Sequence, residues 1–149
     1  MIDLLFILAL FCVLAISSLM VVMIGANVYK STVEQSNLNF NLNTSLSYVS
    51  EKIRQNDLDD SISIGKIEDT QALVLKQDIN GTTYQTLIYY SDGYLRELFA
   101  AQGTELSCAS GQPLIELDGF NIKQGNGYYS FTSISDGVSR QLIVSPRCN

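Results

Sequence analysis

Histidine and tryptophan are absent from this chain, which contains only two prolines and three cysteines among 149 residues. Without histidine, the chain cannot build a histidine-based catalytic triad or a histidine-ligated metal site. Its glycines stand singly in turn-like settings, so no glycine-rich phosphate-binding loop is present. We therefore expect a protein that is not an enzyme and that holds no cofactor and no metal.

Positive charge is also scarce. The chain has 15 acidic and 9 basic residues, which gives a net charge of −6, and only Asp3 and Lys30 lie before Ser31. This acidic balance keeps the later part soluble and argues against DNA or RNA as a partner, because phosphate neutralisation needs clustered Lys and Arg. Lys52 and Arg54 form the only close basic pair, and we expect them on a solvated helix face.

What the chain does have is a long uncharged run, from Leu4 to Ala26. A helix that crosses the hydrocarbon core needs about 20 apolar residues. The Leu, Ile, Phe and Val side chains of the run favour insertion by about 4–8 kcal/mol in total. A buried soluble helix would show a run of about 10–14 residues and a polar face. We therefore predict that residues 1–26 form a transmembrane helix.

A cleaved secretory signal is the other alternative for this run. Such a signal has a basic start and an apolar core of about 7–15 residues. Here only Met1, Ile2 and Asp3 precede a much longer core, without Lys or Arg. The start instead resembles that of a chain whose leader has been removed or lies outside this numbering. The sole nearby cation, Lys30, follows the run, so charge alone gives little guidance on orientation.

Residues 27–56 contain no Gly and no Pro, and we predict that they continue the helix. Apolar residues recur with helical spacing at Leu42, Leu46, Val49 and Ile53. The segment from Asn37 to Asn43 instead alternates with period two, as a half-buried strand does, which leaves a local kink open. A helix running unbroken to Asn56 would be about 80 Å long.

After the helix, the sequence changes from helical to β-strand patterning, and we expect an antiparallel β domain over residues 57–149. Asp57 to Asp60 could bind Ca²⁺ through three carboxylates, but the EF-hand spacing is missing and a solvated loop fits better. Tight turns are predicted at Asn-Gly and Asp-Gly pairs, with one long loop over Ala101–Pro113. The predicted strands are Ile62–Glu68, Ala72–Asp78, Thr83–Tyr90, Tyr94–Ala100, Leu114–Lys123, Tyr128–Ser135 and Val138–Ser145. The fold class is therefore α+β, a long N-terminal helix followed by a small antiparallel sheet domain.

Two of the three cysteines lie in the predicted soluble part. Cys108 and Cys148 can close a disulfide in an exported domain, and the alternative is two free thiols. Cys12 lies in the apolar run and is most simply a small membrane-buried side chain. The carboxylates Glu97, Glu105, Glu116 and Asp118 could in principle form a glycosidase pair, but their spacing does not select one.

Three features of the layout together resemble the type IV pilin-like proteins. They are a short N-terminus, a membrane helix that continues into an exposed amphipathic helix, and a small antiparallel sheet with a late cysteine pair. Ile88–Glu97 and Leu142–Arg147 have counterparts in minor pilins and pseudopilins of Gram-positive systems. The resemblance implies a structural subunit, which we expect to be a minor one, of a pilus-like or pseudopilus filament. It also implies pilin-like partners through the N-terminal helix, and a domain outside the cell.

One departure from that family concerns assembly. Its members usually carry Glu at the fifth position of the mature chain, where it is thought to pair with a neighbouring subunit's N-terminal amine. That position is Leu5 if Met1 is the mature start, and the only acid nearby is Asp3. Asp3 is the candidate assembly residue if the true start differs, and the alternative is a tip-type minor subunit, which can lack this acid. The rival function is a membrane-anchored extracytoplasmic domain that binds a ligand or a partner.

Overall fold

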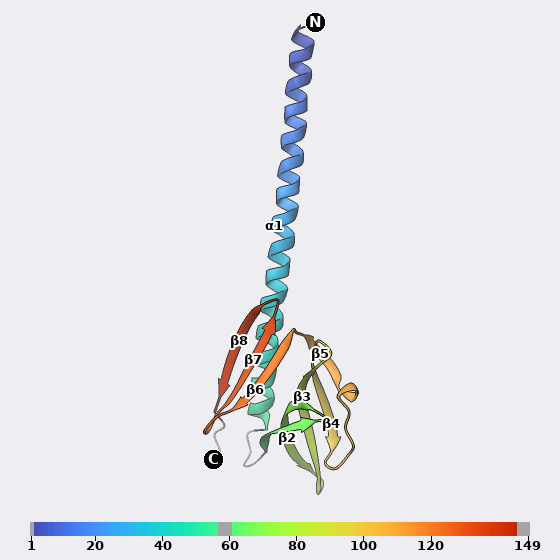
Figure 1. Ribbon diagram of the computed structural model, residues 1–149, viewed down its shortest axis with the longest axis vertical. Helices are drawn as coiled ribbons and strands as arrows, with labels where there is room; N and C mark the ends of the chain where they lie inside the picture. The colour runs from blue at the N-terminus through green and yellow to red at the C-terminus, as the bar shows by residue number, and fades with distance from the viewer. Residues whose placement is uncertain (1, 57–60, 146–149) are drawn as a thin grey trace. The chain divides into compact units, whose positions relative to one another are not determined.

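The computed structural model describes residues 2–56 and 61–145, and in these it contains one long helix followed by eight β-strands (Figure 1). The strands are all antiparallel to their neighbours, which confirms the predicted α+β class. The chain forms two compact units, Met1–Asn37 and Leu38–Asn149. Helix α1 (Ile2–Gln55) supplies the first unit and opens the second.

Helix α1 is unbroken through the segment whose period-two pattern left a kink open. No Gly or Pro occurs between Asn27 and Gln55 to interrupt the ladder of i→i−4 hydrogen bonds. The alternation at Asn37–Asn43 therefore does not mark a strand or a break. Asp57–Asp60, which we predicted as a loop, lie outside the described residues.

The second unit is built around the last four turns of α1. Leu42, Leu46, Val49 and Ile53 are buried at the helical spacing that the sequence shows. Each such side chain contributes about 1.5–3 kcal/mol when it is removed from water. They pack with side chains from both sheets of the unit, including Leu73, Ile88, Leu95, Phe120 and Phe131.

Two antiparallel sheets pack against this buried face of α1. Sheet A holds the first five strands in chain order, and sheet B holds the last three. Sheet A contains β1 (Ile62–Ile67), β2 (Thr70–Ile79), β3 (Thr82–Ser91), β4 (Tyr94–Ala101) and β5 (Gln112–Glu116). Sheet B contains β6 (Gly119–Gln124), β7 (Tyr129–Ser135) and β8 (Val138–Val144).

The single strand that we predicted over Leu114–Lys123 is wrong, because the chain changes sheets there. It leaves sheet A after Glu116 and enters sheet B at Gly119. Between them, the Leu117 N–H donates to the Gly93 carbonyl and the Asp118 N–H donates to the Ile134 carbonyl, each at 2.9 Å. These neighbouring amides bond to different sheets, a change of partner that an apolar pattern does not reveal.

The predicted long loop is shorter than expected. Within it, η1 (Cys108–Ser110) forms a short 3₁₀ turn, capped by the Ser107 hydroxyl, which accepts from the Ala109 N–H. Strand β5 then begins before Pro113, on the edge of sheet A, where a missing N–H is tolerated.

The tight turns lie where the sequence predicts them. Asn80, Asp92 and Asp136 have φ values of 52°, 51° and 49°, and the Gly after each also has a positive φ. Positive φ at both central residues is the type I′ hairpin geometry, which Asn-Gly and Asp-Gly adopt at low cost.

Candidate functional site

The first unit presents a continuous apolar surface. Every large apolar side chain of α1 from Ile2 to Val28 is more than half exposed. Helix α1 includes an 18-residue window with a mean hydropathy of 2.9, none of which is buried inside the protein. By length and composition, α1 is able to cross a membrane, which is consistent with single-pass anchoring.

Two hydroxyl groups on this part of α1 are hydrogen-bonded within the helix. Ser17 donates to the carbonyl oxygens of Val13 and Leu14, at 2.8 and 3.0 Å. Thr32 donates to the Val28 carbonyl at 2.9 Å. Since hydrocarbon offers no hydrogen-bond partner, bonding of this kind makes a hydroxyl compatible with a lipid environment.

The two ends of the apolar surface carry different groups. Asp3 lies in the first turn of α1, where a carboxylate interacts favourably with the helix dipole, and Leu5 is largely exposed. At the other end, Tyr29 is 73% exposed and Lys30 lies 3.9 Å from Glu34. Tyr and Lys are the residue types that favour the membrane–water boundary.

In the second unit, polar side chains fix α1 to sheet B. The Arg140 guanidinium donates to Asn43 Oδ1 at 2.6 Å and to Asn39 Oδ1 at 2.9 Å. Deeper in the core, the hydroxyls of Ser45 and Ser133 bond at 2.9 Å, and both side chains are fully buried. Because an unpaired buried hydroxyl is costly, this pair favours one arrangement of the helix on the sheet.

A second polar cluster fixes α1 to sheet A. Glu97 on β4 accepts from the Lys52 ammonium at 2.6 Å and from the Tyr48 hydroxyl. Burial and the Glu97 carboxylate raise the pKa of Tyr48 above its ordinary value. Burial lowers the pKa of Lys52, but the hydrogen bonds to Glu97 and Tyr48 outweigh it, so the net pKa is raised.

Of the two predicted disulfide cysteines, the structure describes only Cys108. Its Sγ lies 3.4 Å from the Ile67 carbonyl oxygen, and its own carbonyl accepts from the Tyr89 hydroxyl at 2.9 Å. Burial raises the pKa of the Cys108 thiol. No disulfide occurs among residues 2–56 and 61–145, and the predicted partner Cys148 lies outside the described residues.

Two of the four carboxylates considered for glycosidase chemistry have separate partners. Glu97 serves the cluster with Lys52 and Tyr48, whereas Asp118 accepts from the backbone N–H of Asp136. In the described part of the chain, no group of three or more potential metal-ligating side chains gathers.

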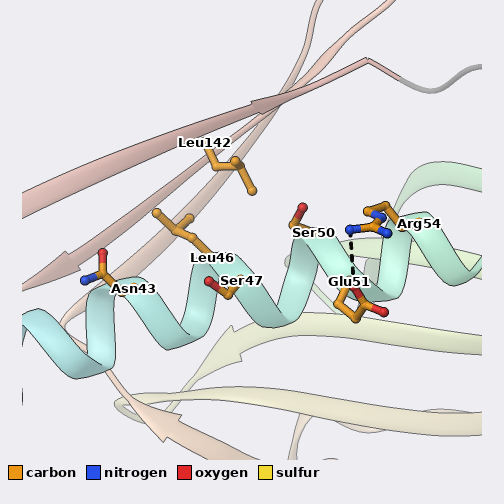
Figure 2. Close-up of a pocket in the computed structure, with 7 residues that line it drawn as sticks. All are labelled: Asn43, Leu46, Ser47, Ser50, Glu51, Arg54 and Leu142. Atoms are coloured by element: carbon orange, nitrogen blue, oxygen red, sulfur yellow. Dashed lines mark ion pairs between the residues drawn. The ribbon is translucent and has the colours of Figure 1, made fainter.

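A shallow hollow of about 350 Å³ lies between α1 and β8 in the second unit (Figure 2). Helix α1 provides polar groups that include Asn43 and Ser50, and the apolar side chains Leu46 and Leu142 point toward one another across it. At one end, Arg54 pairs with Glu51 at 3.8 Å.

Sequence reasoning did not predict Arg140, Asn39 and Asn43 as contact residues. Asn39 and Asn43 are four residues apart, which places them on one face of a helix. That spacing was present within the same segment whose period-two alternation suggested a strand. The partner Arg140 could not be found, because it is 101 residues from Asn39 in the chain.

No curated protein and no solved structure matches the chain. One family profile does match, over residues 40–136, and its description is a domain of unknown function, DUF4860. The matched stretch begins at Phe40 of α1, near the start of the second unit, and ends in the β7–β8 turn at Asp136, so it covers the core helix, sheet A and most of sheet B. The chain therefore belongs to the DUF4860 family.

Proposed function

We propose that this protein is a structural subunit, and a minor one, of a type IV pilus-like or pseudopilus filament assembled from the membrane. The apolar part of α1 is held in the bilayer before assembly and packs with the corresponding helices of other pilin-like subunits afterwards. The β domain then lies outside the cell.

The observation that supports the proposal is that the two parts of α1 have different roles. Its first part exposes apolar side chains on all faces, and its last turns form the core of a small antiparallel domain. Helices in lipid associate through van der Waals packing, since lipid tails are as apolar as the side chains. A helix that is apolar all round therefore suits both the bilayer and the centre of a filament.

Deleting the gene and imaging the cell surface tests the proposal, together with assays of DNA uptake and secretion. We expect filaments or transport to be reduced, and the full chain to co-purify with pilin-like subunits. Unchanged filaments and transport, with no co-purification, would contradict the proposal.

The rival function is a domain that stays anchored in the membrane and binds a partner there. Helix α1 supports it as well, because one helix that is long and apolar enough to cross a membrane is sufficient to anchor a domain there. Shearing the cells separates the two functions. A filament subunit appears in the sheared surface material, whereas a permanent anchor stays with the membrane fraction.

A further inference from the structure

Helix α1 is stabilised by different surroundings in its first and last parts. The large apolar side chains from Ile2 to Val28 are more than half exposed, and this part suits a lipid environment. In hydrocarbon, an unfolded turn would leave N–H and C=O groups without partners, so a bilayer keeps the backbone helical. The last turns are stabilised by the core of the second unit instead, because Leu42, Val49 and Ile53 are almost completely buried.

Residues 31–37 lie between these two parts of α1. All seven are exposed, and they follow Tyr29 and Lys30, whose residue types favour the membrane–water boundary. The second compact unit begins only at Leu38. Water can bond the N–H and C=O groups that an opened turn would free here. Opening therefore costs much less in residues 31–37 than in the lipid-facing part.

The side chains of this segment also favour the helix weakly. Ser31, Thr32, Val33, Ser36 and Asn37 are all of types with a lower helix propensity than Ala, Leu, Glu or Lys. Propensity alone would not make the segment weak, because residues 44–50 are hardly better helix formers. Those residues belong to the turns that the core buries, and such packing is the main source of helix stability in proteins.

Two local interactions in the segment do not compensate for the missing burial. The Thr32 hydroxyl donates to the Val28 carbonyl at 2.9 Å, and a bond of this kind slightly destabilises a helix and often bends it. Lys30 lies 3.9 Å from Glu34, but Lys before Glu is the less favourable order for an i,i+4 pair. Both side chains are largely exposed, so water screens the pair.

Directly after the exposed segment, three asparagines attach α1 to both sheets. Asn39 and Asn43 accept from the Arg140 guanidinium of β8 at 2.9 and 2.6 Å. Asn41 donates to the Glu116 carbonyl of β5 at 3.3 Å. The weakly supported part of the helix therefore ends abruptly where these contacts begin.

We propose that residues 31–37 form a hinge, which opens by local unfolding of about two helical turns while both flanking parts of α1 stay helical. Opening lets the β domain change its direction relative to the membrane helix without exposing its core. The hinge rests on the membrane anchoring of α1 and not on filament assembly. It therefore applies equally to a filament subunit and to a permanently anchored domain.

Hydrogen exchange of the full chain in lipid nanodiscs, read by mass spectrometry of its peptides, measures the opening. We expect the backbone amides of residues 31–37 to exchange about a hundredfold faster than those of residues 46–53. The amides of residues 10–24 should stay protected, because the bilayer keeps them helical and excludes water.

A matched pair of double variants tests whether weak helix formation causes the fast exchange. Thr32→Ala with Ser36→Ala raises the helix propensity of the segment and removes the hydroxyl bond to Val28. Exchange of residues 31–37 should then slow about fivefold. Ser47→Ala with Ser50→Ala raises propensity in the part that the core stabilises, and it should leave the exchange of residues 31–37 unchanged.

Spin labels on non-natural side chains at Val22 and Glu51 measure the change of direction, and they leave the native cysteines in place. Both positions are exposed. A straight helix spans about 43 Å between them. We expect a broad distribution of distances that extends well below this value. Thr32→Ala with Ser36→Ala should narrow the distribution toward it.

Three results would overturn the proposal. Exchange of residues 31–37 as slow as that of residues 46–53 would show that the segment stays helical. Unchanged exchange in the Thr32 and Ser36 double variant would assign fast exchange to exposure rather than to a weak helix. A single narrow distance near 43 Å in the unaltered chain would show that α1 behaves as one straight rod.

Discussion

Glu97 connects one strand to two side chains of α1, and the protonation of those side chains links stability to pH. The pKa values of Tyr48 and Lys52 are both raised in the folded protein. Their ordinary values are about 10. A raised pKa means that the folded state keeps its proton longer than the unfolded state. The stabilisation is therefore complete below the ordinary pKa and is lost as pH rises through the folded pKa.

We predict that the free energy of unfolding falls as pH rises above about 10. Denaturant unfolding of the full chain in detergent, followed by tyrosine circular dichroism from pH 8 to 11, measures this. Tyr48→Phe combined with Lys52→Met should flatten the fall. Tyr128→Phe, at an exposed tyrosine, should not. An identical pH profile in the double variant would show that the cluster has no part in the fall.

The predicted disulfide between Cys108 and Cys148 has a direct consequence for stability. If Cys108 and Cys148 are bonded, Cys108→Ser should destabilise the second unit by about 2–4 kcal/mol. Cys148→Ser should match it, and the double variant should cost no more than either single one, because one bond is lost in all three. Cys12→Ser is the control, since Cys12 lies on the exposed apolar part of α1.

Mass spectrometry of unreduced protein from its host decides whether the bond exists. Two alkylatable thiols at Cys108 and Cys148 in correctly exported protein would contradict it. A slow reaction at Cys108 alone would not, because burial raises the pKa of this thiol and so lowers its thiolate fraction.

Elements are held together in the second unit by a few polar contacts of long sequence separation. We predict that Arg140 and Asn43 are coupled by about 0.5–1.5 kcal/mol. A double-mutant cycle with Asn43→Ala and Arg140→Met, measured by denaturant unfolding, gives this number. Asn37→Ala is the matched control, since it changes helix propensity at an exposed Asn of the same helix. Additive effects of the two variants would show that the contact does not stabilise the unit.

At the scale of elements, the sequence predicted the buried helix face and the hairpin turns, because both follow from local rules. Leu42, Leu46, Val49 and Ile53 revealed the buried helix face, and Asn80-Gly81 and Asp136-Gly137 revealed tight hairpins. These signals are local because they follow from helical period and backbone φ.

The sequence did not predict which backbone groups and side chains pair with one another. The pattern from Leu114 to Lys123 gives no sign that the Leu117 N–H bonds to the β3–β4 turn of sheet A, whereas the Asp118 N–H bonds to β7 of sheet B. The contacts of Arg140 and of Ser133 join positions 88 to 101 residues apart, which no window of sequence connects. The apolar run of α1 was visible in the sequence because its residues are neighbours in the chain, whereas the hollow between α1 and β8 joins Leu46 to the distant Leu142.

For the whole molecule, the free energy of membrane insertion is the sum of the contributions of the side chains in the apolar run. Its favourable free energy is about 4–8 kcal/mol, and one Arg near the helix centre costs about 2.5–3.5 kcal/mol. We therefore predict that Leu14→Arg still inserts, whereas Leu10→Arg together with Leu14→Arg loses most of the membrane-bound protein. Alkaline extraction of membranes measures the fraction that remains.

The control pair places the same two charges beyond the apolar run, as Thr32→Arg and Ser36→Arg. Both positions are exposed on α1, so the helix should be retained. Full extraction of this control would mean that added charge, rather than loss of apolar length, releases the protein.

The long separation between Asn39 and Arg140 also determines when the second unit can fold. Helix α1 is synthesised first, yet its buried face finds its last partners only on β7 and β8, near the end of the chain. Folding rates fall as contacts become more distant in sequence. During synthesis the half-made domain therefore exposes Leu42, Leu46 and their neighbours, and the unit closes only once the final strand has been added.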